Sequence, residues 1–239
     1  MSVLQRLWER ISSAQPAPPA WVVGVTCLAA LLVVLNTGSW RLAGKVITIA
    51  HEGGHALVSV LSGRRLEGIR LHADSSGVTY SRGKRRGPGL VLTAAAGYVT
   101  PPLLGVGAAL LLAERHVTAM LWLALALLAV TFLAVRNAFG AVAVLATAAG
   151  VFAVSYFASA AVQAGFAYLA AWFLLLGGMR PVLELSRRRR SGRARTPRAG
   201  LSDADQLARL TGVSRGAWIA LFLLICVAAL ALGTRLLIP

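Results

Sequence analysis

Two histidines and a glutamate lie close together in the segment His51-Glu52-Gly53-Gly54-His55. In a helix, His51 and His55 stand one turn apart, so both imidazoles project from one face and can bind the same metal ion. Glu52 lies beside the first imidazole, where a carboxylate can take a proton from water that zinc has acidified. The spacing predicts a hydrolytic centre with one catalytic zinc ion, His51 and His55 as ligands and Glu52 as general base.

The surroundings of this segment strengthen the prediction. Ionisable side chains in the middle of an apolar helix each cost at least about 2.5 to 3.5 kcal/mol when charged, so their presence indicates a function. The simpler interpretation is that His51 and His55 are neutral and hydrogen-bonded within a helix bundle. Gly53 and Gly54 would let another helix or a substrate backbone come close, and ordinary helix packing explains them equally well.

The composition is that of an integral membrane protein. Of the 239 residues, 57% are hydrophobic and 13% are charged, whereas soluble domains have about 25% charged residues. We expect an all-α polytopic protein forming a single membrane-embedded domain over residues 1–239. Since a span needs about 20 apolar residues, we expect about seven transmembrane helices. They cover about residues 20–37, 43–62, 89–113, 117–135, 138–154, 157–178 and 216–237.

Positive charge gathers in two loops between the apolar stretches. A net charge of +16 would suggest a nucleic-acid partner in a soluble protein. Here the basic residues concentrate at residues 63–87 and 180–215, and basic loops of membrane proteins face the cytoplasm and its anionic lipids. We therefore expect anionic lipid headgroups as partners and no nucleic acid.

The two basic loops also predict the topology. Four expected spans separate them, so both lie on the cytoplasmic side, with the N-terminus inside and the C-terminus outside. Basic residues precede the first apolar stretch as in a signal peptide, but without a clear small-residue cleavage site we expect an uncleaved first span. An excess of Arg over Lys and abundant Ala, Leu and Val suggest a bacterial plasma membrane.

Each basic loop has a distinct local pattern. In the first, Leu66–Leu71 and Gly77–Tyr80 flank a turn-like Asp74-Ser75-Ser76 segment, which predicts a small β-hairpin at the membrane surface. In the second, residues 186–200 are rich in Arg, Ser, Gly and Pro, which predicts a flexible basic tether.

Other residues near span ends could take part in a site. Gly97 and Tyr98 are followed by Pro101 and Pro102, which break or kink a helix, so opened backbone there could line a cavity. Asn137 stands at a turn between two spans and could orient a substrate, although such a residue is more often an interfacial anchor.

Three segments carry a resemblance to a known family. They are His51-Glu52-Gly53-Gly54-His55-Ala56, Ala95-Ala96-Gly97-Tyr98 and Ser202-Asp203-Ala204-Asp205. With them, most of residues 43–238 resembles the site-2 protease class of intramembrane zinc metallopeptidases, and in particular its compact bacterial members of the peptidase M-fifty-B type. The resemblance implies hydrolysis of a peptide bond in or near a transmembrane segment of a protein substrate, as in regulated intramembrane proteolysis.

The resemblance also implies a carboxylate as third zinc ligand, but the Asn-Pro-Asp-Gly-like segment that supplies it in better known members is missing here. Asp203 and Asp205 precede the last span in a similar order, so Asp203 is the first candidate and Asp205 the alternative. Both could equally serve as helix-capping residues, because Ser202 and Asp205 have the spacing of a capping box. His72 and His116 are further candidates.

The sequence leaves two functions open. The first is an intramembrane zinc endopeptidase in which Glu52 activates water. The second is a non-enzymatic membrane protein, either a metal-binding transporter or a proteolytically inactive relative that binds transmembrane helices. Glu52 separates them, because hydrolysis needs a base between the two histidines and the other roles do not.

Overall fold

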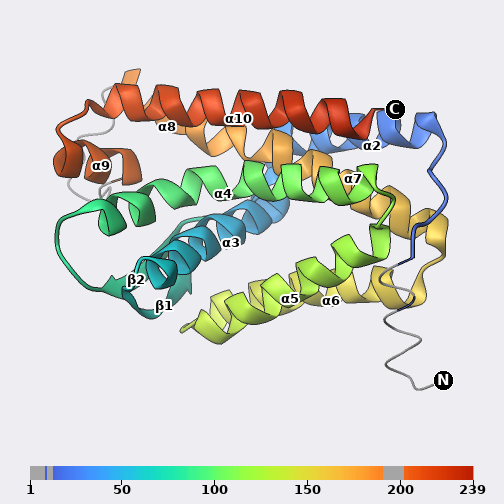
Figure 1. Ribbon diagram of the computed structural model, residues 1–239, viewed down its shortest axis with the longest axis horizontal. Helices are drawn as coiled ribbons and strands as arrows, with labels where there is room; N and C mark the ends of the chain where they lie inside the picture. The colour runs from blue at the N-terminus through green and yellow to red at the C-terminus, as the bar shows by residue number, and fades with distance from the viewer. Residues whose placement is uncertain (1–8, 10–12, 191–201, 239) are drawn as a thin grey trace.

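The computed structural model describes residues 9, 13–190 and 202–238, and these form a helical bundle with one small sheet (Figure 1). Of the predicted tether, residues 191–200 lie outside this description, and residues 186–190 continue a helix. The elements are α2 (Ala20–Leu35), α3 (Thr37–Leu61), β1 (Arg65–Leu71), β2 (Gly77–Arg82), α4 (Pro88–Ala113), α5 (Val117–Ala134), α6 (Ala138–Phe157), α7 (Ala160–Gly177), α8 (Met179–Arg190), α9 (Asp203–Thr211) and α10 (Arg215–Leu237).

The predicted count of seven transmembrane helices is not confirmed. Within the described residues, five helical stretches are long and apolar enough to cross a membrane, and they correspond to the last five expected spans. The first two expected spans, 20–37 and 43–62, instead form α2 and α3, which meet at an angle of 102° and count together as one further broken span. The structure thus has five or six candidate spans.

The bend between α2 and α3 has a local cause. Asn36 ends α2 and caps α3, since its side chain accepts a hydrogen bond from the backbone N–H of Ser39. The guanidinium of Arg180 donates to the carbonyl of Val34 at the end of α2 and lies 4.6 Å from the ring centroid of Trp40. The hydrogen bonds to the Ser39 N–H and the Val34 carbonyl satisfy backbone groups that the break exposes.

The segment before α2 lies at the same end of the bundle as the turn between α4 and α5. Gln15 precedes α2 and contacts the turn between α4 and α5. Its backbone N–H donates to the Arg115 carbonyl, and its side-chain amide exchanges hydrogen bonds with Thr118. The end of α10 lies at this same end of the bundle (Figure 1). Residues 13–19 and the end of α10 thus lie at the same end of the bundle, and the side of the membrane that each faces stays a prediction.

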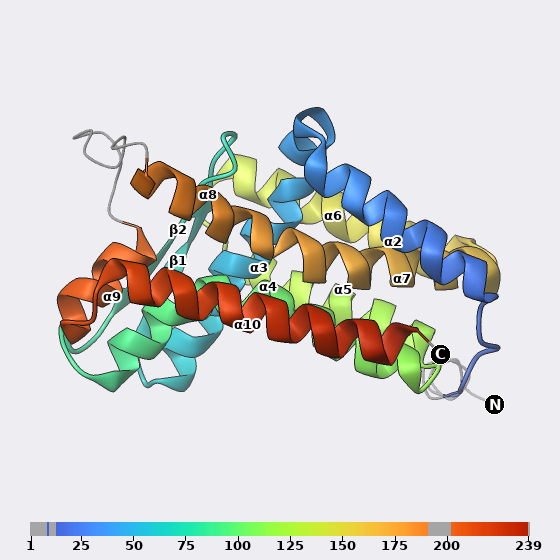
Figure 2. The same ribbon diagram turned by 90° about the horizontal axis from the view of Figure 1, so that it is seen from above.

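Helix α4 is the centre of the bundle. It packs against α3, α7 and α10, and α10 also runs alongside α7 and α8 (Figure 2). Small residues allow the close approach of α4 and α7, because Ala108, Ala109, Ala167 and Ala171 are all buried between them and their neighbours. By contrast, α5 and α6 expose large apolar side chains such as Leu133 and Val142, as expected for helices that face lipid.

The predicted hairpin is present, but it lies along α3. Strands β1 and β2 pair antiparallel around a turn in which Asp74 accepts a hydrogen bond from the Ser76 backbone. The turn contacts the first half of α3, where Lys45 donates to the Ala73 carbonyl and Thr48 to the Ser75 carbonyl. The hairpin therefore runs back past the level of the histidines rather than staying at the end of α3.

Asn137 fixes the outer edge of this hairpin. Its side-chain amide accepts from the backbone N–H of Leu71 at 3.1 Å and donates to the carbonyl of the same residue at 2.7 Å. Beside it, the Arg136 N–H donates to the Ile69 carbonyl. The turn between α5 and α6 thus completes the hydrogen bonding of β1, and Asn137 has a structural place on the hairpin edge.

Part of the predicted second loop is also helical. Helix α8 continues α7, so the apolar stretch extends through Ala160–Arg187. Helix α9 then docks through Ala204 and Leu207, which are fully buried in a cluster with α4, α8 and α10. Because α9 packs in this position, its first residue, Asp203, lies against His51 and His55 of α3.

We predict that Asn137→Ala loosens the hairpin. The substitution leaves two backbone groups of Leu71 unpaired, and a lost hydrogen bond to a buried group costs about 1 to 3 kcal/mol. Amide hydrogen exchange over Arg65–Leu71 should accelerate, while exchange in α10 stays unchanged. Equal exchange of β1 in the variant and the parent would contradict this role of Asn137.

Candidate metal centre

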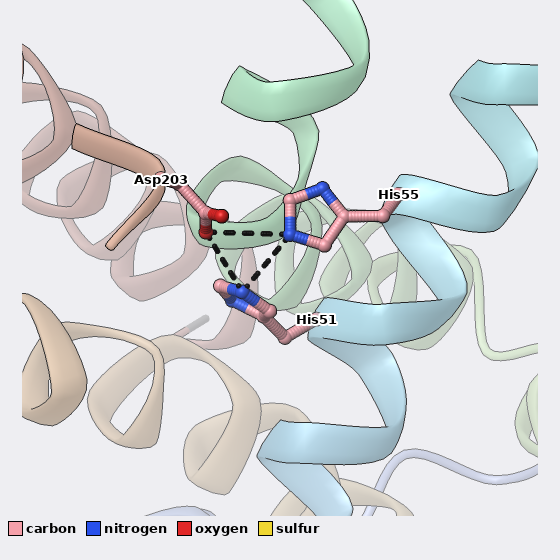
Figure 3. Close-up of side chains that lie close together, drawn as sticks. All are labelled: His51, His55 and Asp203. Atoms are coloured by element: carbon pink, nitrogen blue, oxygen red, sulfur yellow. Dashed lines mark hydrogen bonds and ion pairs between the residues drawn. The ribbon is translucent and has the colours of Figure 1, made fainter. Parts of the chain in front are cut away.

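The structure brings His51, His55 and Asp203 together at one point between α3 and α9 (Figure 3). The two imidazole Nε2 atoms are 3.1 Å apart. Asp203 Oδ2 lies 3.1 Å from His51 Nε2 and 3.3 Å from His55 Nε2. Three potential ligand atoms thus form a nearly equilateral triangle.

The size of this triangle fits zinc. A tetrahedral zinc ion with bonds of about 2.0 to 2.1 Å holds neighbouring ligand atoms about 3.3 Å apart. Three protein ligands would leave the fourth position open, which is the arrangement of catalytic zinc sites. The side chains of His51, His55 and Asp203 keep 18%, 10% and 22% of their surface exposed, so the described residues do not fully enclose the group.

Gly97 makes room for this group. A Cβ atom built on Gly97 would lie 2.4 Å from His55 Nε2 and 2.5 Å from His51 Nε2, which is closer than atoms can approach. Gly54 serves helix packing, because a Cβ there would lie 2.1 Å from Thr100 Oγ1 of α4. Gly97 on α4 therefore leaves room for the two imidazole nitrogens, whereas Gly54 lets α3 and α4 pack closely.

Further contacts orient the imidazoles. His55 Nδ1 lies 2.6 Å from the backbone carbonyl of Thr93. A carbonyl can only accept, so Nδ1 donates its proton to Thr93, and Nε2 is the nitrogen that faces His51 and Asp203. The Tyr98 ring meets the His51 ring edge to face at 4.7 Å, and Tyr98 in turn packs against Phe222 of α10.

The two aspartates of α9 occupy different environments. Burial alone would raise the pKa of the Asp203 carboxyl, but its hydrogen bonds and charge interactions with His51 and His55 outweigh burial and hold that pKa well below its usual range. A lowered pKa favours the ionised carboxylate, which is the form that can bind a metal ion. Asp205 instead accepts from the backbone and hydroxyl of Ser202 in a capping box and pairs with Arg215 at 3.3 Å.

Glu52 is buried on the hairpin side of α3. Only 4% of its surface is exposed, and its Oε2 accepts a 2.7 Å hydrogen bond from the hydroxyl of Thr79 on β2. Gly77 lies against the same side chain, since a Cβ there would come within 2.6 Å of Glu52 Oε1. The hairpin thus fixes one carboxylate oxygen and leaves the other without a hydrogen bond among the described residues.

The other predicted candidates lie elsewhere. His72 is exposed beside the hairpin turn, His116 precedes α5 at the opposite end of the bundle, and Asn137 holds the hairpin edge. Sequence reasoning missed Thr79 and Thr93. Neither has a local signal, because each acts only through a tertiary contact with α3.

Comparison with known proteins gave one result. The model of the family described as Peptidase M50B-like matches residues 24–233, which includes α3, the hairpin and α9. No curated protein and no solved structure matches the chain. The family match confirms the resemblance inferred from the sequence.

We predict that Asp203→Ala loses bound zinc and Asp205→Ala keeps it. Only Asp203 supplies an oxygen to the triangle, whereas Asp205 caps α9. Loss of such a cap costs about 0.5 to 2 kcal/mol of stability. The measurement is the zinc content of each purified protein after dialysis.

Asp203→Asn is the matched control for shape, because an amide preserves the volume but binds zinc poorly. It should lose zinc as Asp203→Ala does, with thermal unfolding close to that of the metal-free parent. Full zinc content in both Asp203 variants would exclude Asp203 as a ligand.

Proposed function

The chain belongs to the Peptidase M50B-like family, and we propose that it is an intramembrane zinc endopeptidase. Its substrate would be a membrane protein, cut in or near a transmembrane segment. The convergence of His51, His55 and Asp203 at distances that suit zinc carries the proposal. The candidate membrane spans around these residues support a reaction within the membrane.

Each residue of the site has a defined task in this proposal. A bound zinc ion would acidify water and polarise the substrate carbonyl. His51, His55 and Asp203 would hold the ion, and the Thr93 carbonyl keeps His55 in the correct tautomer. Glu52 would take the proton of the attacking water on its free oxygen and then deliver it to the leaving amine.

We further propose that the end of the bundle with the basic loops faces the cytoplasm of a bacterium. Residues 63–87 and the start of α10 gather at this end (Figure 1), and Arg136 lies beside the hairpin there. Basic loops are retained on the cytoplasmic side. In this orientation residues 13–19 and the end of α10 lie at the outer face.

A non-enzymatic role explains fewer of the contacts. A metal transporter or a helix-binding relative needs the histidines at most. Burial of a carboxylate costs free energy, and here the buried Glu52 is hydrogen-bonded by a separate element. An arrangement that retains and orients this carboxylate favours hydrolysis.

We predict that Glu52→Gln abolishes cleavage and retains zinc. The amide keeps the volume of the side chain but cannot accept the proton, and general-base catalysis contributes about 100-fold or more to the rate. The experiment co-expresses the chain with a panel of single-span membrane proteins tagged at both ends and compares their fragments.

Zinc content serves as the control for Glu52→Gln, since the substitution leaves all three ligand atoms in place. Identical fragments from the parent and the variant would refute the mechanism. A parent that cuts no member of the panel but co-purifies with one of them would support the non-enzymatic alternative.

We also predict that Thr79→Val lowers kcat by about tenfold or more without a comparable change in KM. It removes a hydrogen bond to a charged group, which is worth about 1.5 to 3 kcal/mol. Thr79→Ser should restore most of the rate. Thr147→Val is the matched control, because that hydroxyl binds only the Ala143 carbonyl within α6. Equal losses in the two valine variants would exclude a positioning role for Thr79.

A further inference from the structure

A basic cleft lies where the hairpin meets the beginning of α4. Its volume is about 560 Å³, within the range of small-molecule sites. Three arginines and no carboxylate line it among the described residues, and the lining consists of Arg64, Ser81, Arg82, Gly83, Arg85 and Leu90. The cleft therefore favours an anion.

Arg64 is fixed at the wall of the cleft. Its guanidinium donates to the hydroxyl of Ser81 at 3.2 Å and to the backbone carbonyls of Lys84 and Ser81 at 2.8 and 3.4 Å. Gly83 packs against the same group, since a Cβ there would lie 3.2 Å from Nη1. All these partners are uncharged, so the positive charge of Arg64 is held in position without being neutralised.

The other two arginines differ in their partners. Arg82 pairs with Glu67, which lies in the adjoining cavity with Arg65 and Arg136. Arg85 is exposed and has no hydrogen bond or ion pair among the described residues. One fixed and one free guanidinium thus face the cleft, and the fork of an arginine suits phosphate oxygens.

The position of the cleft selects the kind of anion. Arg64 follows the end of α3 at Leu61, and Arg85 precedes the start of α4 at Pro88. The first turn of α4 has no side-chain cap, so the positive end of the helix adds to the field. Apolar Leu90 lines the same cleft. Lipid phosphates lie at this level, just beyond the ends of apolar membrane helices.

We propose that this cleft binds the phosphate of an anionic phospholipid headgroup. Arg64 and Arg85 hold the phosphate oxygens, and the hydroxyl of Ser81, whose oxygen accepts from Arg64, donates its proton to the ligand. The acyl chains continue into the bilayer beside exposed apolar residues of the adjoining helix turns, such as Leu61 and Leu92. The site is separate from the metal ligands and does not depend on hydrolysis.

The test uses the full chain in a neutral detergent and phosphatidylglycerol with a dansyl group on one acyl chain. Energy transfer from the tryptophans reports binding. Arg85→Gln should weaken binding by about tenfold or more, since hydrogen bonds to charged groups are strong. Arg85 makes no contact that the fold needs, whereas Arg64→Gln would also disturb the hairpin.

Arg187→Gln is the matched control. Arg187 is exposed on α8 and does not line the cleft, and its substitution removes the same single charge. Its effect should stay below about twofold, as expected for a screened distant charge. Equal weakening by Arg85→Gln and Arg187→Gln would show general attraction to the basic face and would overturn the proposal.

Two further arms identify the ligand. Unlabelled phosphatidylglycerol should displace the probe, and inorganic phosphate at the same concentration should not. Displacement by inorganic phosphate as effective as by the lipid would show a free-phosphate site and overturn the assignment to a headgroup. Saturable binding of the labelled lipid that is equally strong in the parent and in Arg85→Gln would also overturn the assignment to this cleft. The assay contains no catalytic step, so it stands or fails independently of the protease proposal.

Discussion

The site depends on bringing one carboxylate from residue 203 to two imidazoles on α3. Those imidazoles are part of a largely apolar bundle, where an unpaired carboxylate would be costly. The buried contacts of Ala204 and Leu207 with α8 and α10 hold α9 in the position that this meeting requires. The capping box of Ser202 and Asp205 then starts α9 at the residue that must point inward. The packing of Ala204 and Leu207 on one side of α9 thus fixes the position of the Asp203 carboxylate beside the imidazoles.

Small residues let α4 and β2 pack closely against α3. Gly97 on α4 faces the imidazole nitrogens, Gly54 lets α3 approach α4, and Gly77 on β2 lies against Glu52. Any side chain at these positions would collide with an imidazole, a neighbouring helix or the Glu52 carboxylate. The free energy that glycine costs within a helix, about 1 kcal/mol relative to alanine, is offset by contacts that only this close approach allows.

Local patterns were sufficient to predict the parts of the site that lie on one element. The spacing of His51 and His55 follows from helical periodicity, and the β-hairpin from alternation around a turn. The scarcity of acids, together with the family resemblance, left Asp203 as the first candidate and Asp205 as the alternative. The structure separates these two candidates, since the oxygens of Asp205 contact Ser202 and Arg215 rather than the imidazoles.

Features that depend on tertiary contacts could not be predicted in this way. The apolar stretches around Asn36 suggest two separate spans, yet an efficient cap there allows a sharp bend, stabilised by Arg180 from a distant helix. The partner of Glu52 is equally distant, because Thr79 reaches it only when the hairpin lies along α3.

The hairpin links two features that the sequence keeps apart. On its outer edge, Asn137 and Arg136 from the α5–α6 turn complete the hydrogen bonding of β1. On its inner face, Thr79 of β2 holds the carboxylate of Glu52. The hydrogen bonds between β1 and β2 connect these two edges into one rigid unit. The position of the Glu52 carboxylate is therefore determined by the packing of α5 and α6 as well as by the helix that carries it.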